Sequence, residues 1–211
     1  MAAETFGKCA YCESHVKTTS HGSVDHYRPQ SKYWWLAYCY DNFLFSCGIC
    51  NSDYKKDFFP VSGRRLTAGM TANELTPDGI DREAGMHWAE FQAQHEAEQP
   101  HIPDPYLDDP EQDLAWMEDP NGKKVNLVAS NLSQRAGRVA SALAACGVNR
   151  EEVARRRYEV LQVLKATMRL LQVEPDEAER EAMRIRLERM AEEHNPYAGM
   201  ARFYLRAWNL I

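Results

Sequence analysis

The sequence predicts an α+β protein in which a small module stapled by cysteines precedes a mostly α-helical C-terminal part. Two C-x-x-C pairs bracket short, strand-like segments near the N-terminus, and after residue 131 apolar residues recur at helical spacing. Of the 211 residues, 44% are hydrophobic and 27% are charged, which is usual for globular proteins.

The longest apolar run, residues 33–40, is far shorter than the ~20 residues that a membrane-spanning helix needs. The first seven residues lack the basic and then apolar pattern of a signal peptide. We therefore expect a cytoplasmic protein that does not enter a membrane.

The net charge is −6, and residues 66–130 alone hold 3 Lys and Arg against 14 Asp and Glu. This acidic middle is interpreted as a solvated surface, with a contact surface for a basic partner as the alternative.

Four of the six cysteines form the two C-x-x-C pairs, which are Cys9–Cys12 and Cys47–Cys50, 34 residues apart. Two such pairs supply the four thiolates of a tetrahedral zinc site, so structural zinc is predicted. The alternative is two unrelated pairs of buried thiols. Cys39 and Cys146 lie outside the pattern and are predicted to be core residues.

Between the cysteine pairs, residues 24–27 suit a strand that ends at Pro29, and a second extended piece runs from Asn42 into Cys47. A short helix is predicted over residues 48–57, stopped by Pro60.

Adjacent side chains on a strand diverge, so Asp25 can bind a metal while His26 faces a substrate. Asn51 and Lys55 share one face of the predicted helix. Carboxylate and amide oxygens suit Mg²⁺ or Mn²⁺, and a neutral imidazole beside the ion can take a proton from water. The pattern indicates metal-assisted hydrolysis of a phosphodiester. Taken alone, an Asp-His pair is more often structural.

Residues 9–60 resemble an HNH (ββα-metal) nuclease with an accessory zinc site. The matching residues are Cys9 and Cys12, Asp25-His26, Asn42-Phe43, Cys47, Cys50-Asn51, and Lys55. The resemblance implies that His26 is the general base and that Asp25 and Asn51 hold the catalytic ion. Asn51 stands where many members of the family have His.

The resemblance gives the other residues supporting roles. Asn42 would brace the loop that carries the base, and Lys55 would contact or neutralise phosphate. Arg28, and with less support Lys56, would also contact phosphate.

Three longer sequence motifs are similar to those of a stand-alone bacterial subgroup of HNH proteins. They are V-D-H-Y-R-P, N-F-L-x-S-C-x-x-C-N and K-x-x-x-F-P. That subgroup serves in Septu-type and retron-associated anti-phage defence. The similarity implies a partner ATPase of the ABC/SMC type, and about a quarter of the chain carries it.

The aromatic run, which is Tyr33, Trp34, Trp35, Tyr38 and Tyr40, is interpreted mainly as core. Base stacking is the alternative, with Tyr33 expected to be the most exposed ring.

The chain is divided into the nuclease module (residues 1–62), an acidic, turn-rich connection (63–130) and a helical region (131–211). A helix is expected over residues 83–98, and a hairpin turns at residues 120–123. Further helices are expected over residues 131–146, from a capping box at Asn149 onward, from Pro175 and from residue 195. The row Arg155 to Arg157 is interpreted as a solvated face, with phosphate binding as the alternative.

The sequence therefore predicts a metal-dependent HNH endonuclease that cleaves nucleic acid, with DNA favoured over RNA. Its cofactors would be structural zinc and catalytic Mg²⁺ or Mn²⁺. The alternative is a non-catalytic zinc-binding adaptor. The acidic net charge predicts weak binding of the lone chain to DNA, which fits delivery by a partner.

Overall fold

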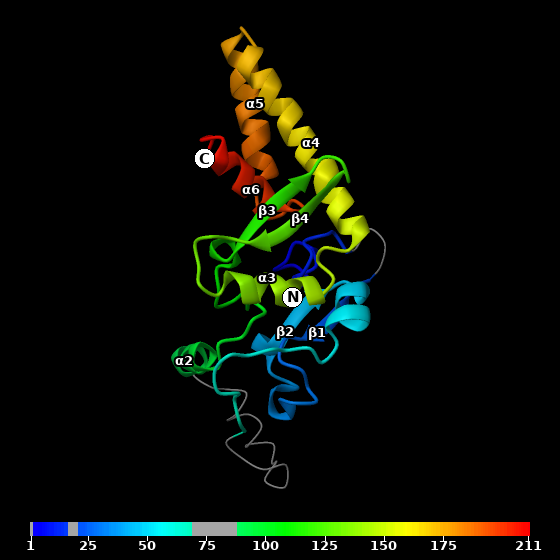
Figure 1. The fold of residues 1–211 in the computed structure, drawn as a ribbon, viewed down its shortest axis with the longest axis vertical. Helices are drawn as coiled ribbons and strands as arrows, with labels where there is room; N and C mark the ends of the chain where they lie inside the picture. The colour runs from blue at the N-terminus through cyan, green and yellow to red at the C-terminus, as the bar shows by residue number, and fades with distance from the viewer. Residues whose placement is uncertain (1, 17–20, 69–87) are drawn as a thin grey trace.

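The computed structural model describes residues 2–16, 21–68 and 88–211 (Figure 1). The fold is a mixed α+β arrangement, as predicted, with two small antiparallel sheets and several helices in the described part of the chain. The strands are β1 (Ser23–His26), β2 (Phe43–Ser46), β3 (Leu114–Asp119) and β4 (Lys124–Ala129). The α-helices are α2 (Trp88–Glu98), α3 (Ala136–Ala145), α4 (Glu151–Val173), α5 (Glu177–Met190) and α6 (Ala198–Ala207).

The antiparallel pair β1–β2 lies below α3 in the view of Figure 1 and carries the Asp-His pair. Asp25 pairs with Leu44 and His26 with Phe43 across the two strands. The predicted helix after β2 is a π-helical turn, Ile49–Lys55. It ends at Lys56, whose φ of 47° cannot continue a right-handed helix. Such turns are rare and often lie at functional sites.

The β3–β4 hairpin forms the second sheet, and its turn lies where the sequence predicts it. The amide of Gly122 donates to the Asp119 carboxylate at 2.9 Å and so closes the turn. A Cβ at Gly122 would lie 2.2 Å from that carboxylate, so glycine suits this position. Trp116 and Leu127 face each other across the strands and are both buried. The helices α3, α4 and α6 pack against this hairpin, so it is the centre of the helical region (Figure 1).

The chain between α3 and α4 packs against the π-helical turn. Gly147 ends α3, as predicted, with a φ of +73° that favours glycine. A Cβ at Gly147 would lie 2.6 Å from the ring of Tyr54, so only glycine lets the two segments approach this closely. Helix α3 begins at Ala136 and not at residue 131 as predicted, because residues 131–135 form bends and turns.

The predicted capping box at Asn149 is wrong. Arg150 is the N-cap residue of α4 and makes no side-chain cap bond. The Asn149 side chain instead accepts from the amide of Leu127 and donates to its carbonyl, both at 2.8 Å. Asn149 therefore satisfies backbone groups of β4 and ties this strand to the start of α4.

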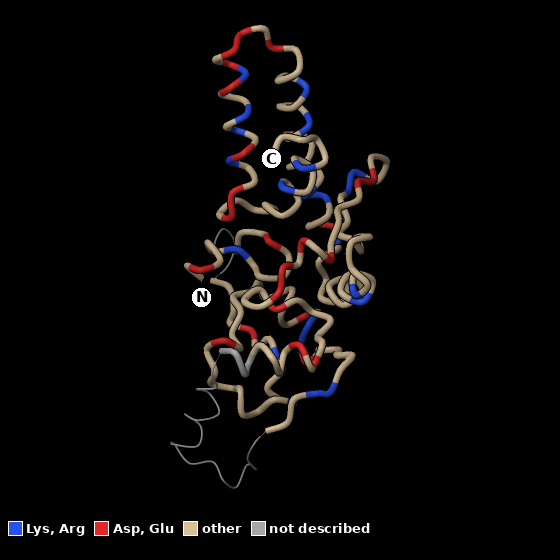
Figure 2. The backbone as a smooth tube through the Cα atoms, turned by 90° about the vertical axis from the view of Figure 1, so that its left-hand side faces the viewer, with Lys and Arg blue, Asp and Glu red and all other residues tan. Residues whose placement is uncertain are grey.

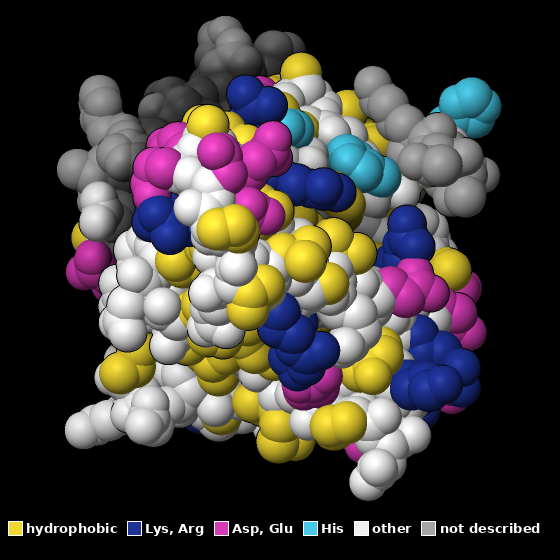
Figure 3. Space-filling model, turned by 90° about the horizontal axis from the view of Figure 1, so that it is seen from above, with side chains coloured by type: hydrophobic (Ala, Val, Ile, Leu, Met, Phe, Trp, Pro, Cys, Tyr) yellow, Lys and Arg dark blue, Asp and Glu magenta, His cyan; other side chains and the backbone are white. Residues whose placement is uncertain are grey.

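The helices α4 and α5 form a long antiparallel pair that rises from the sheet, with α6 beside its base (Figure 1). The side chain of Asp176 caps α5 by accepting from the amide of Glu179. Acidic and basic residues alternate along α5 (Figure 2), and Arg184 pairs with Glu181 at 3.3 Å. Acidic side chains gather around the exposed α4–α5 turn (Figure 3).

The first part of the helix predicted over residues 83–98 lies outside the described residues, and the described part is α2. One buried apolar cluster includes residues from all three predicted ranges, so the boundaries at residues 62 and 130 stay predictions. Cys39 and Cys146 are buried, as predicted. None of the helices in the described segments is long and apolar enough to cross a membrane.

The structure predicts different costs for two residues of the supposed capping box. Asn149→Ala leaves the buried amide and carbonyl of Leu127 without partners, so we expect the free energy of unfolding to fall by about 1–3 kcal/mol. Glu152→Ala, at an exposed position on the first turn of α4, should change it by less than about 0.5 kcal/mol. Urea denaturation measures both, and equal losses would support the capping box instead.

Candidate active site

The four paired cysteines converge at one point. The Sγ atoms of Cys9, Cys12, Cys47 and Cys50 all lie within 4.8 Å of one another. Tetrahedral zinc with Zn–S bonds of about 2.3 Å needs sulfur–sulfur distances of about 3.8 Å, so a small contraction would complete the shell. The cluster can thus hold a metal ion such as zinc.

Arg150 completes the surroundings of this cluster, and the sequence analysis did not identify it. Its guanidinium donates to the sulfur of Cys50 at 3.1 Å and lies 3.7 Å from that of Cys12. Burial lowers the pKa of Arg150, but the thiolates of these two cysteines raise it more, and the net shift is upward. Four thiolates around Zn²⁺ leave two excess negative charges, and Arg150 offsets one of them. No local motif marks Arg150, which lies 100 residues after Cys50.

Asp25 lies on β1 in a buried polar group with Lys55 and Tyr11. The Lys55 ammonium lies 3.0 Å from the nearer carboxylate oxygen of Asp25 and donates to the His26 carbonyl at 2.8 Å. The Tyr11 hydroxyl also donates to the Asp25 carboxylate. Burial raises the pKa of Tyr11 well above its usual value, and the Asp25 charge raises it further, so Tyr11 stays a donor.

His26 is held in one tautomer by its neighbours. Its Nε2 lies 2.9 Å from the carbonyl oxygen of Ala37, which can only accept, so Nε2 carries the proton. The other nitrogen, Nδ1, is then the basic one. The ring packs edge-to-face on Phe43 with centroids 5.2 Å apart. This arrangement can take a proton from a water molecule at Nδ1.

Asn42 holds the backbone that follows His26. Its Oδ1 accepts from the Arg28 amide at 2.8 Å, and its Nδ2 donates to the Arg28 carbonyl at 3.0 Å. Asn42 is fully buried at the end of a 3₁₀ turn, Tyr40–Asn42, directly before β2. The side-chain amide of Asn42 therefore bonds to the backbone after β1 in the way that a neighbouring strand would.

Asn51 lies on the π-helical turn beside the strand that carries Asp25. Its Nδ2 donates to the Ser23 hydroxyl at 3.1 Å and lies 3.5 Å from the Val24 carbonyl. Asp25 and Asn51 together offer the hard oxygen donors that Mg²⁺ or Mn²⁺ takes, and in the structure the cation at Asp25 is Lys55. A catalytic ion at these two residues stays a prediction. Among the described residues, the cysteine cluster is the group of three or more His, Cys, Asp or Glu side chains that can hold a metal.

Arg28 and Lys55 do not contact solvent in the structure, and the phosphate contacts expected of them stay predictions. Both side chains are 0% exposed. The Arg28 guanidinium is paired with the buried Glu98 at 2.9 Å, while Lys55 is paired with Asp25. Each buried cation is already neutralised. Lys56 is exposed, and its contact with phosphate stays a prediction.

The aromatic run also differs from expectation at Tyr33. Its ring is 0% exposed and its hydroxyl donates to Glu98, the partner of Arg28. Tyr38 and Tyr40 are the exposed rings, at 80% and 50%. In the row of three arginines, Arg155 and Arg156 form exposed pairs with glutamates, and Arg157 is buried.

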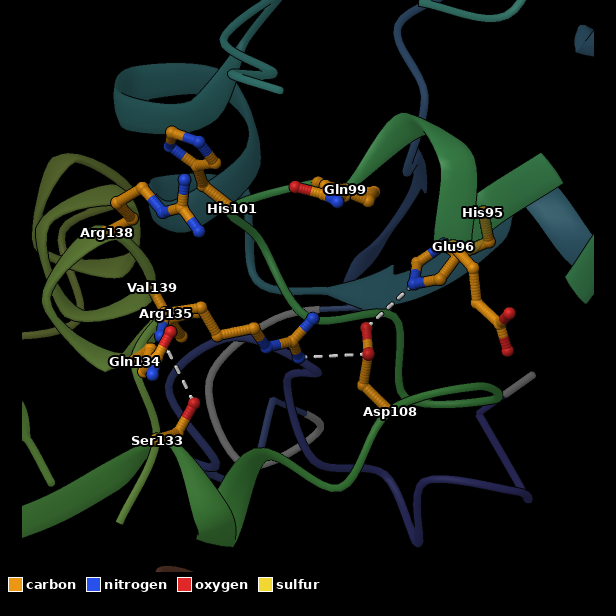
Figure 4. A pocket seen from close by; sticks show the side chains of 11 residues that line it. His95, Glu96, Gln99, His101, Asp108, Ser133, Gln134, Arg135, Arg138 and Val139 are labelled. Atoms are coloured by element: carbon orange, nitrogen blue, oxygen red, sulfur yellow. Dashed lines mark hydrogen bonds and ion pairs between the residues drawn. The ribbon is translucent and has the colours of Figure 1, made fainter. Parts of the chain in front are cut away.

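Arg28 joins the candidate site to a cavity of about 400 Å³ between α2 and α3 (Figure 4). Its guanidinium lies 3.1 Å from Nδ1 of His95, and Nε2 of His95 lies 3.0 Å from the Asp108 carboxylate. Asp108 in turn pairs with Arg135 at 2.9 Å. Burial raises the pKa of Asp108, but His95 and Arg135 lower it more. The charges on this side of the cavity are thus paired with one another.

Arg150 is predicted to strengthen metal binding. Arg150→Leu should weaken zinc affinity about 10–100-fold, because such outer partners usually contribute this much. Competition with a chromogenic chelator measures the affinity, and elemental analysis should find one zinc per chain. Arg155→Leu, exposed on the same helix, is the control and should bind zinc as the wild type does. Equal affinities in both variants would contradict the role of Arg150.

Lys55 is predicted to stabilise the fold through Asp25. Lys55→Met leaves a buried carboxylate uncompensated, so the free energy of unfolding should fall by about 3–5 kcal/mol. The double change of Lys55→Met with Asp25→Asn should restore part of this loss, and exposed Lys56→Met should cost under about 0.5 kcal/mol. Denaturation without divalent ions measures all three. A Lys55→Met protein as stable as Lys56→Met would refute the buried pair.

Part of the chain is similar to a Septu protein. Over 81 residues it is 38% identical to Septu protein PtuB of Bacillus mycoides (strain KBAB4). The match covers 32% of this chain and 28% of the length of that protein. No protein-family model matches the chain, and no solved structure matches it. The chain is thus a weak homologue of a Septu protein over about a third of its length.

Proposed function

We propose that this chain is a metal-dependent HNH endonuclease that hydrolyses phosphodiester bonds of nucleic acid, with DNA as its substrate. We further propose that it is the nuclease subunit of an anti-phage defence system. The observation that carries the proposal is His26, whose tautomer the Ala37 carbonyl fixes so that Nδ1 is basic. The partial similarity to a Septu protein supports the role in defence.

In this proposal His26 takes the proton of a water molecule at Nδ1 while the water oxygen attacks phosphorus. The bond from phosphorus to the leaving oxygen breaks, and that oxygen receives a proton from solvent. The carbonyl of Ala37 stabilises the imidazolium by accepting from Nε2. Asn42 holds the loop after His26 in place through both backbone groups of Arg28.

Asp25 and Asn51 would hold a Mg²⁺ or Mn²⁺ ion, which when bound supplies charge stabilisation at the phosphate. Lys55 neutralises Asp25 when no such ion is present. Cys9, Cys12, Cys47 and Cys50 would hold structural zinc that fixes the N-terminal loop and the π-helical turn.

The net charge of −6 gives the lone chain little attraction for DNA. Within the proposed defence system, a partner ATPase of the ABC/SMC type would therefore bring the nuclease to its substrate. RNA stays the alternative substrate.

One observation favours a second candidate function, a non-catalytic zinc-binding adaptor. The proposed metal ligand Asp25 is 4% exposed and already paired with Lys55, an arrangement that suits a purely structural role. Such an adaptor would bind zinc and be indifferent to Mg²⁺ or Mn²⁺.

The nuclease is predicted to depend on His26. With Mg²⁺ or Mn²⁺ and the partner ATPase, the wild type should cleave supercoiled plasmid, and His26→Ala should be slower by about 100-fold or more. His21→Ala, at an exposed position in the same segment, is the control and should keep the wild-type rate.

Agarose gels resolve the nicked and linear products of this assay. Cleavage that His26→Ala leaves unchanged would contradict the proposed base. No cleavage by any variant, with zinc bound and the ATPase present, would favour the adaptor.

A further inference from the structure

A second cavity, of about 180 Å³, lies between the N-terminal loop and the β3–β4 hairpin. Apolar side chains from several elements form its walls, among them Leu44, Leu114, Trp116, Leu127 and Leu143. All five are buried. Because so many buried apolar side chains line it, this cavity suits an apolar ligand group better than disordered water.

Arg157 of α4 also lines this cavity and is only 2% exposed. One terminal nitrogen donates to Asn149 at 3.2 Å, and the guanidinium lies 5.9 Å from the ring centre of Tyr197. Its Nε has no hydrogen-bond partner among the described residues. The charge of Glu13 acts favourably on Arg157, but among the described residues no carboxylate accepts a hydrogen bond from the guanidinium. A buried guanidinium with an unsatisfied N–H is costly, and an anion that accepts from Nε would lower that cost.

The two acidic residues at the cavity do not accept a hydrogen bond from Nε of Arg157. Glu111 is paired with Arg202 and Arg206, at 2.5 and 2.6 Å. Glu13 lies 3.7 Å from the ammonium of Lys8 and accepts weakly from the amide of Gly199. Arg157 is therefore the charge in the cavity that a ligand would match.

We propose that this cavity binds a small aromatic carboxylate, with its carboxylate on Nε of Arg157 and its ring against Trp116. The volume suits such a ligand, since an apolar cavity of about 150 Å³ holds benzene. A carboxylate on a guanidinium forms a charge-assisted hydrogen bond, which gives the site its preference for anions.

The ligand would also contact a residue of the candidate active site. Tyr11 lines the cavity, and its hydroxyl bonds to the carboxylate of Asp25. An occupied cavity would thus restrain Tyr11 and change how Asp25 is held. This regulatory consequence rests on the proposed function, whereas the binding itself does not.

Nuclear magnetic resonance on the full chain tests the binding, with benzoate as the probe. The Nε–Hε resonance of Arg157, assigned by its absence in Arg157→Lys, should shift and saturate as benzoate is added. Benzyl alcohol has the same ring without the charge and should bind at least about tenfold more weakly.

Two variants localise the effect, and one is a matched control. Arg157→Met should bind benzoate at least about tenfold more weakly. Gly199→Ala should also weaken binding, because its added methyl would lie 3.3 Å from Trp116 inside the cavity. Arg155→Ala, exposed on the same helix, should bind as the wild type does.

The proposal is overturned if the Arg157 resonance does not respond to benzoate, or if it shows contact with an ordered water that benzoate does not displace. Equal binding of benzyl alcohol, or unchanged affinity in Arg157→Met, also overturns it. Because resonance shifts are independent of DNA cleavage, these outcomes are separate from failure of the proposed nuclease.

Discussion

The convergence of four cysteine sulfurs is the constraint on which the rest of the structure depends. Two turns that lie 34 residues apart meet there, and Arg150 brings the start of α4 to the same point. The hairpin that carries Asp25 and His26 lies between the two turns in the chain. A metal ion at the sulfurs would therefore fix both the candidate site and its contact with the helical region, because loop closure restricts the unfolded chain as well.

Buried polar pairs then set the shape of the candidate site. Asn42 holds both backbone groups of Arg28, and the Arg28 side chain is anchored by Glu98 from α2. The loop after His26 is thus fixed from two directions, and the carbonyl of Ala37 fixes the tautomer of the His26 imidazole. Buried ion pairs often add little net stability, and the proposed activation of water by His26 would need the fixed geometry that such pairs give.

Local signals in the sequence were enough for the cysteine pairs, the two short strands between them, the hairpin turn at residues 120–123 and the long helices, because spacing and periodicity record these directly. They were not enough for the ion pairs, whose partners lie far apart in the chain, such as Lys55 with Asp25 and Arg28 with Glu98. An isolated Arg or Lys before a loop looks like a surface cation until its partner is known. Asn149 shows a similar limit. Its local pattern predicted a helix cap, but its side chain bonds instead to the backbone of Leu127 in β4, which is distant in the sequence.

Anomalous diffraction can test whether the four cysteines hold one metal ion and whether Asp25 and Asn51 hold a second. Crystals grown with zinc and saturating Mn²⁺ would be measured on both sides of each absorption edge. We expect zinc among the four sulfurs and manganese between Asp25 and Asn51, with the Lys55 ammonium displaced from Asp25. Zinc at the sulfurs with no manganese at Asp25, still paired with Lys55, would contradict the catalytic site and leave the adaptor.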